Sequence, residues 1–118
     1  MREKIRDKER LNHIIESIDN IFEFTSNLRF EDFITNKMVK FAVIKNLEII
    51  GEASNLLTID LRNKNSQIEW NLIIGLRHIL VHDYYQISDS IIWNTITEDL
   101  PDFRIKIQKI LTDIKNED

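Results

Sequence analysis

Residues 37–57, KMVKFAVIKNLEIIGEASNLL, decide the fold of this chain. Apolar side chains recur in this stretch at helical spacing and cover much of the circumference of the helix that they predict. They are Met38, Phe41, Ala42, Ile44, Leu47, Ile49, Ile50, Ala53 and Leu56. A helix that is apolar nearly all round lies at the centre of a bundle or in an interface between subunits. Gly51 inside it costs about 1 kcal/mol relative to alanine, so we expect another helix to approach it closely.

The segment before this helix has the amphipathic pattern of a bundle helix. Residues 4–28 predict a long first helix, and residues 30–36 predict a connector with one short helical turn at 31–34. Thr35 or Asn36 can cap the central helix. The apolar stripe of the first helix is Leu11, Ile14, Ile15, Ile18, Ile21, Phe22 and Leu28. Its basic residues alternate with acids and predict a solvated face: Arg2, Lys4, Arg6, Lys8 and Arg10.

Two more helices are predicted after the central one. Residues 60–67 are polar, and we expect them to form a loop. A third helix should begin near Ile68 or Trp70 and end near Tyr84.

A fourth helix is predicted over residues 90–115, with Ser88 or Asp89 as its cap. Its apolar stripe is Ile92, Ile96, Leu100, Phe103, Ile107, Ile110 or Leu111, and Ile114. Pro101 falls inside this stripe and predicts a kink or a break, because proline removes a helical hydrogen bond. Four amphipathic helices with short connections predict an all-α antiparallel bundle. We expect residues 1–118 to form a single domain.

The composition narrows the class of protein. The chain has no cysteine, which excludes disulfides and thiolate metal sites. No apolar run approaches the roughly 20 residues of a membrane span, and no signal-like block follows the charged N-terminus. We therefore expect a cytoplasmic protein with no membrane contact. A net charge of -4 argues mildly against a dedicated nucleic-acid binder, although an enzyme with a local cationic pocket stays possible.

The third helix carries an arginine, two histidines and a tyrosine within eight residues, in the stretch RHILVHDY at residues 77–84. The planar, permanently charged guanidinium of Arg77 can hold a phosphate and stabilise the charge that builds on it. His82 can move a proton near neutral pH, which is worth roughly 10²–10⁴ in rate. His78 can act as a second proton carrier or a phosphate contact. Together these residues suit cleavage of an RNA phosphodiester without a metal or a cofactor.

The spacing of Arg77 and His82 constrains how they could act together. Five residues place them roughly 140° apart around a helix. The arginine must reach round the helix, or the helix must end near His82, or a second copy of the chain must complete the site. The third arrangement predicts a homodimer with the cleft at its twofold interface.

Each of these residues also has a plainer interpretation. His78 and His82, at i and i+4, can instead ligate a metal, although no third ligand lies near them in sequence. Glu48 and Glu52 are either buried partners of Arg77 or the polar side of the central helix. Arg-x4-His is by itself a weak motif that occurs by chance in many proteins.

The chain nevertheless resembles the HepT-like toxins of the HEPN superfamily nearly from end to end. The stretches that carry the resemblance are 42–53 (AVIKNLEIIGEA), 68–77 (IEWNLIIGLR), 92–93 (IW) and 99–101 (DLP). Arg77, His82 and Tyr84 match the Arg-x4-His-x-Tyr motif of that family. His78 departs from the commonest form, in which Asn or Asp often follows the arginine.

The resemblance implies an α-helical homodimer that acts as a metal-independent ribonuclease, the toxin of a type VII toxin–antitoxin pair. It makes Arg77 and His82 the catalytic residues. It makes Tyr84 the residue to which a minimal nucleotidyltransferase (MNT) antitoxin transfers AMP, although the adjacent Tyr85 competes for that assignment. An anionic nucleotide there would compete with RNA for Arg77.

Two other functions compete with the ribonuclease hypothesis. The first is a non-catalytic HEPN-type module that binds a nucleotide, RNA or a nucleotidyltransferase without cutting. The second is a purely structural dimeric bundle, in which the polar residues of the third helix form interface pairs.

Overall fold

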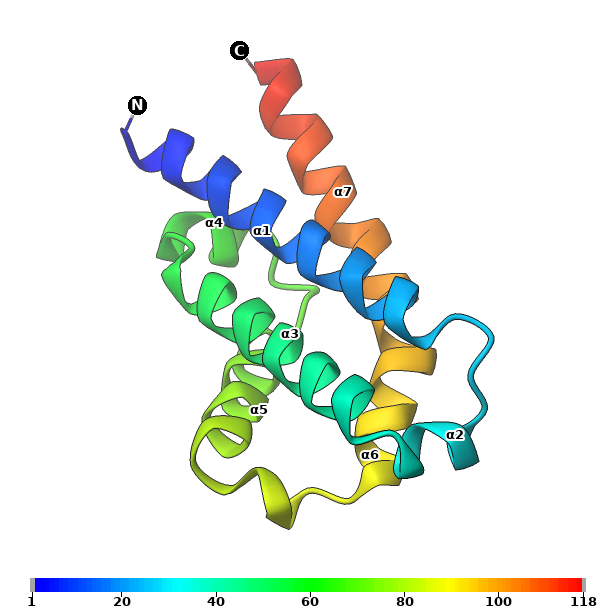
Figure 1. Cartoon of the computed structure of the whole chain (residues 1–118). Coiled ribbons are helices and arrows are strands. Elements are labelled where there is room, and N and C mark those ends of the chain that lie inside the picture. The colour runs from blue at the N-terminus through cyan, green and yellow to red at the C-terminus, as the bar shows by residue number, and fades with distance from the viewer. Residues whose placement is uncertain (1, 118) are drawn as a thin grey trace.

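The two longest helices, α1 and α3, lie antiparallel and side by side (Figure 1). In the computed structural model, which describes residues 2–117, α1 spans Arg2–Thr25 and α3 spans Lys37–Leu56. The interior face of α1 is the predicted apolar stripe, of which Leu11, Ile14, Ile18 and Ile21 are fully buried. This helix ends three residues earlier than expected, because Asn27 adopts a left-handed conformation with φ 66°.

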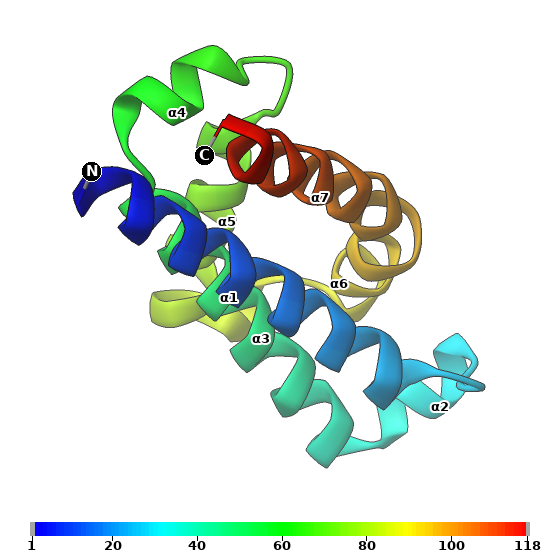
Figure 2. The ribbon, with the colours of Figure 1, turned by 90° about the horizontal axis from the view of Figure 1, so that it is seen from above.

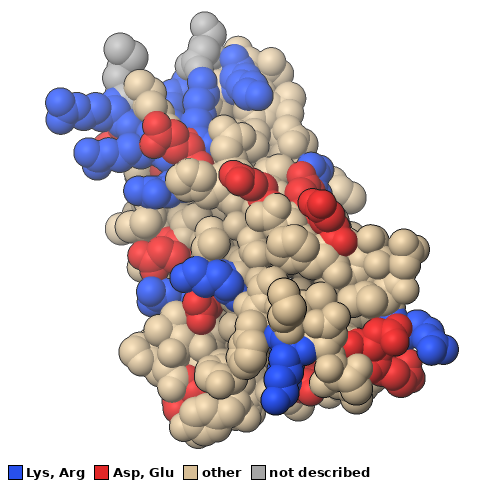
Figure 3. Space-filling view, in the orientation of Figure 1, with Lys and Arg blue, Asp and Glu red and all other residues tan. Residues whose placement is uncertain are grey.

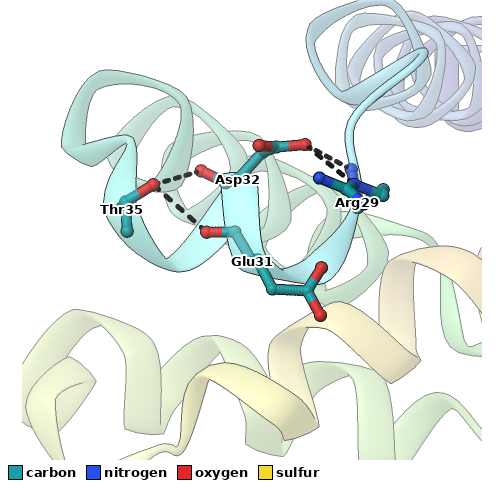
Figure 4. Close-up of polar contacts among 4 residues, drawn as sticks. All are labelled: Arg29, Glu31, Asp32 and Thr35. Atoms are coloured by element: carbon teal, nitrogen blue, oxygen red, sulfur yellow. Dashed lines mark hydrogen bonds and ion pairs between the residues drawn. The ribbon is translucent and has the colours of Figure 1, made fainter.

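The connector between these helices is more helical than its sequence suggests. Helix α2 spans Phe30–Thr35. The backbone N–H of Arg29 donates to the carboxylate of Asp32 (3.0 Å), and the Thr35 hydroxyl donates to two carbonyls of the preceding turn (Figure 4). Asn36 then caps α3 by accepting a hydrogen bond from the backbone N–H of Val39 at 3.1 Å, which confirms one of the two predicted caps.

The central helix α3 matches its predicted range to within one residue. It packs against α1 on one side and α5 on another. Its buried face includes Val43, Ile44, Leu47 and Ile50. A second apolar face of α3 is exposed. The buried and the exposed face together explain why the sequence of this helix is apolar nearly all round. That exposed face consists of Met38, Phe41, Ile49 and Leu56.

The prediction of a loop over residues 60–67 is wrong for its first half. Helix α4 spans Ile59–Lys64, and Leu61 is buried on its inner side. The Thr58 hydroxyl accepts from the backbone N–H of Leu61 at 3.2 Å and donates to the buried carboxylate of Asp7 at 2.7 Å. A contact with a residue 51 positions away therefore fixes this short helix, and local polarity gives no sign of it.

Helix α5 spans Trp70–Asp83, as predicted, and a 3₁₀ turn over Tyr84–Gln86 follows it. The Trp70 indole donates to the backbone carbonyl of Asn65 (3.1 Å), so the start of α5 is tied to the end of α4.

The last predicted helix consists of three consecutive helical pieces. Ser88 caps α6 (Asp89–Asn94), a π-helical turn covers Thr95–Asp99, and α7 spans Leu100–Glu117. The irregularity that Pro101 predicted is this π turn. Because the turn contains Thr97, whose carbonyl lies four residues before the proline, it accommodates the missing N–H without breaking the helix.

The four main helical segments complete an all-α bundle, and residues 2–117 contain no β-strand. Helix α7 packs on α1, so that the start of α1 and the end of α7 lie at one end of the molecule, while α6 lies at the other (Figure 1). Figure 2 looks down on the end that carries both termini. No helix within residues 2–117 is both long enough and apolar enough to cross a membrane.

Candidate active site

Arg77 lies where α5 crosses α3 and packs directly against Gly51. A β-carbon added to Gly51 would overlap Cβ of Arg77 and lie 2.8 Å from its Cγ and 3.2 Å from the carbonyl oxygen of Ile73. The close helix approach that the sequence predicted at Gly51 is therefore confirmed. The glycine allows the aliphatic part of the arginine to rest on the backbone of α3.

The guanidinium of Arg77 pairs with a carboxylate on the next residue of α3. Its Nη2 lies 2.9 Å from Oε2 of Glu52, with 33% of the arginine side chain and 45% of the glutamate side chain exposed. Nε of Arg77 is buried and has no hydrogen-bond partner among the described residues, 2–117. The sequence left open whether Glu48 and Glu52 are buried partners of Arg77. Glu52 is its partner, but the pair is only partly buried. Glu48 instead lies 3.9 Å from Lys45.

The two histidines of α5 lie together and are both exposed. The ring centroids of His78 and His82 are 4.7 Å apart, with an angle of 55° between the ring planes. Arg77 reaches Glu52 on α3, whereas the ring of His82 packs at a tilt against the ring of His78. Within one chain, the Arg77–Glu52 pair and the pair of histidines are therefore two separate units.

Tyr84 begins the 3₁₀ turn that follows α5. Its ring packs edge-on against Phe41 of α3, with the centroids 5.8 Å apart, and 43% of the residue is exposed. Tyr85 is 73% exposed, and its hydroxyl donates to Asp83 at 3.4 Å. Tyr84 is thus held against the central helix, while Tyr85 is mostly exposed and packs edge-on against Tyr84, with the ring centroids 5.9 Å apart.

A groove of about 370 Å³ surrounds Arg77 where α1, α3 and α5 adjoin. Basic residues from all three helices line it: Arg10 and His13 on α1, Lys45 on α3, and Arg77 on α5. The sequence pattern predicted a merely solvated role for Arg10 and drew no attention to His13 or Lys45. The only available signal was the i, i+3 spacing of Arg10 and His13, and such spacing is common on helices.

The described part of the chain offers little to hold a metal ion. Within residues 2–117, no three His, Asp or Glu side chains gather as a potential metal site. The interpretation of His78 and His82 as metal ligands therefore lacks a third ligand among residues 2–117.

Comparison with known proteins places these features in a wider context. The model of a protein family described as "Ribonuclease HepT-like" matches residues 14–110. A protein of Methanocaldococcus jannaschii named "Putative RNase MJ1380" is 40% identical over 98 residues, which are 83% of this chain and 90% of that protein. "Probable ribonuclease HepT" of Thermococcus cleftensis is 39% identical over 103 residues, or 87% of this chain and 94% of that protein. No solved structure gives a significant match.

Proposed function

Because this chain belongs to the HepT-like ribonuclease family, we propose that it is a metal-independent endoribonuclease and the toxin of a type VII toxin–antitoxin pair. The observation that carries the proposal is the extent of the family match. It covers residues 14–110 and so includes Arg77, His82 and Tyr84 together with the helices that hold them.

In the proposed reaction, Arg77 and His82 act on one RNA phosphate. His82 removes the proton from a ribose 2′-hydroxyl or protonates the departing 5′-oxygen. Arg77 stabilises the negative charge that develops on the phosphorane oxygens, because its guanidinium uses one N–H group on Glu52 and has others to offer. His78, whose ring lies 4.7 Å from that of His82, contacts the phosphate or carries a second proton.

We propose that a homodimer brings Arg77 and His82 to the same phosphate. Within one chain, Arg77 pairs with Glu52 and His82 packs against His78, so the two side chains belong to separate units. One end of the exposed apolar face of α3, where Met38 is 85% and Phe41 50% exposed, lies next to Tyr84. Burial of this end against a second copy would remove apolar surface from water and leave Ile49 and Leu56 in the groove beside Arg77. The arginine of one subunit would then approach the histidine of the other.

The proposed partner is an MNT-type nucleotidyltransferase that transfers AMP to Tyr84. The exposure of Tyr84 and its position two residues from His82 support this assignment. A nucleotide attached there would place a negative charge near Arg77 and exclude RNA from the site.

The test is cleavage of RNA by the purified protein in the presence of EDTA. The wild type should produce cut RNA, and His82→Ala and Arg77→Ala should each abolish the product. Cleavage that survives in both variants would overturn the assignment of these two residues.

A non-catalytic binding module is the second candidate function. The net charge of -4 and the separation of the Arg77 and histidine units favour it. It predicts saturable binding of RNA or nucleotide while the RNA stays intact after long incubation with unmodified protein.

A further inference from the structure

The groove beside Arg77 gathers basic side chains in a chain that is acidic overall. Arg10, His13, Lys45 and Arg77 line it, although the whole protein carries a net charge of -4. Arg10 and His13 are one helical turn apart on α1, so both face the groove. Only the packing of α1 and α5 on α3 brings these four residues together.

The carboxylates of the groove leave part of this positive charge unpaired. Glu52 pairs with Arg77 at 2.9 Å, and Glu48 lies 3.9 Å from Lys45. Within residues 2–117, neither Arg10 nor His13 forms an ion pair with a carboxylate. Figure 3 shows acidic and basic side chains next to each other over the region of α3 and α5, with more Lys and Arg toward the start of α1. On the α1 side of the groove, Arg10 therefore offers an anion a positive charge that no carboxylate within residues 2–117 pairs with, and His13 offers a ring N–H beside it.

A larger pocket nearby has the opposite character. It measures about 560 Å³ and lies between α3, α5, the π turn and α7. Its rim carries the acidic residues Glu69, Glu98, Asp99 and Asp102, with Lys106 as its one lysine. An RNA backbone would be repelled there. The two cavities thus differ in charge, and of these two it is the groove beside Arg77 that suits a polyanion.

The groove also has an apolar part. Ile49 and Leu56 of α3 and Val81 of α5 line it and are exposed. A single-stranded RNA offers unpaired bases and riboses to such side chains while its phosphates meet the basic ones.

We propose that this groove binds the backbone of single-stranded RNA through Arg10 and His13, next to the phosphate that Arg77 contacts. This inference rests on the proposed ribonuclease function. It extends that function to residues of α1, which lie outside the Arg-x4-His-x-Tyr motif.

The experiment measures RNA binding in a background that does not cut. A fluorescein-labelled 12-nucleotide RNA of mixed sequence is titrated with the full-length His82→Ala protein, and Kd is read by fluorescence anisotropy at several KCl concentrations. Arg10→Gln and His13→Gln are added to this background. Lys109→Gln is the matched control, because it removes one positive charge from the exposed face of α7, outside the groove.

Arg10→Gln should raise Kd several-fold and lower the slope of log Kd against log salt by about 0.7, which is the value for one lost contact to a single-stranded phosphate. His13→Gln should also raise Kd, whereas Lys109→Gln should leave Kd and slope nearly unchanged. Thermal unfolding should be the same for all variants, since neither Arg10 nor His13 forms an ion pair within the described residues.

The outcomes separate the groove from the catalytic proposal. If the wild type cuts RNA but Arg10→Gln and His13→Gln bind it as Lys109→Gln does, the groove assignment is overturned and the ribonuclease function stands. If the wild type does not cut RNA, the ribonuclease proposal fails, and the anisotropy titration still decides whether the groove binds RNA.

Discussion

Gly51 and Arg77 touch so closely that a β-carbon on the glycine would overlap the β-carbon of the arginine. Glu52, the next residue, then holds the guanidinium at 2.9 Å. Two adjacent residues of α3 therefore set the position of Arg77, one by leaving room for its stem and the other by pairing with its charge.

Gly51→Ala should destabilise the protein and reduce RNA cleavage. The added methyl group forces α3 and α5 apart or displaces Arg77, and overpacking of this kind costs about 1–3 kcal/mol. Urea unfolding measures the loss. Gly75→Ala is the matched control, because a β-carbon at Gly75 meets no atom within 4 Å. That substitution should stabilise α5 by up to about 1 kcal/mol. Equal effects at the two glycines would contradict the close approach.

Arg77→Ala should abolish cleavage with little loss of stability. The Arg77–Glu52 pair is 33% and 45% exposed, and such a pair contributes about 0–1 kcal/mol to folding. Loss of transition-state stabilisation should lower kcat by about 10²–10³. Arg104→Ala breaks the pair with Asp19 elsewhere on the surface and should leave kcat unchanged. A loss of about 3–5 kcal/mol on Arg77→Ala would instead favour the purely structural bundle.

Thr58→Ala should be more destabilising than Ser88→Ala. Both residues cap short helices, which is worth about 1 kcal/mol each. The Thr58 hydroxyl also donates to the buried carboxylate of Asp7 at 2.7 Å, and its loss leaves that oxygen without this donor. Urea unfolding should therefore show an additional loss of about 1 kcal/mol for Thr58→Ala. Equal losses would mean that the hydroxyl bond to Asp7 adds nothing beyond the bond from the Thr58 backbone N–H, which the substitution keeps.

Asp19 should make stability fall in acid. Hydrogen bonds from the Arg104 side chain hold the pKa of the Asp19 carboxyl below its ordinary value of 3.8. Because the pKa is lower in the folded state, the contribution is present above pH 3.8 and is lost as the pH falls through the folded-state pKa. Urea unfolding between about pH 2 and 5 should show a shallower decline for Asp19→Asn. A parallel decline in both proteins would contradict this role.

Tyr84→Phe should prevent the proposed modification by AMP, whereas Tyr85→Phe should not. Tyr84 is held against Phe41 two residues from His82, and Tyr85 is mostly exposed. Mass spectrometry after co-expression with an MNT-type nucleotidyltransferase measures the added AMP. Modification that persists in Tyr84→Phe and disappears in Tyr85→Phe would reverse the assignment.

The sequence predicts the long helices well because their signals are local. Apolar stripes at helical spacing predict α1, α3, α5 and α7, and Asn36 and Ser88 cap helices as their side chains allow. Helix α4 escapes prediction although Thr58 is a local N-cap signal, because its six residues are mostly polar and a contact with Asp7, far away in sequence, helps to fix it. The sequence predicts an irregularity at Pro101 but not its form. A π turn is one of several ways in which a helix can accommodate a proline.

The sequence by itself determined the all-α bundle and the close helix approach at Gly51, because both depend on residue type and helical spacing. Residue type drew attention to Arg77, His78 and His82, and the resemblance to the HepT-like family added a role for Tyr84. Only the tertiary structure decided that Glu52 is the partner of Arg77 and that Arg10, His13 and Lys45 share its groove. Helical spacing places residues on the faces of one helix, but the faces that meet are chosen by the packing of three helices against each other.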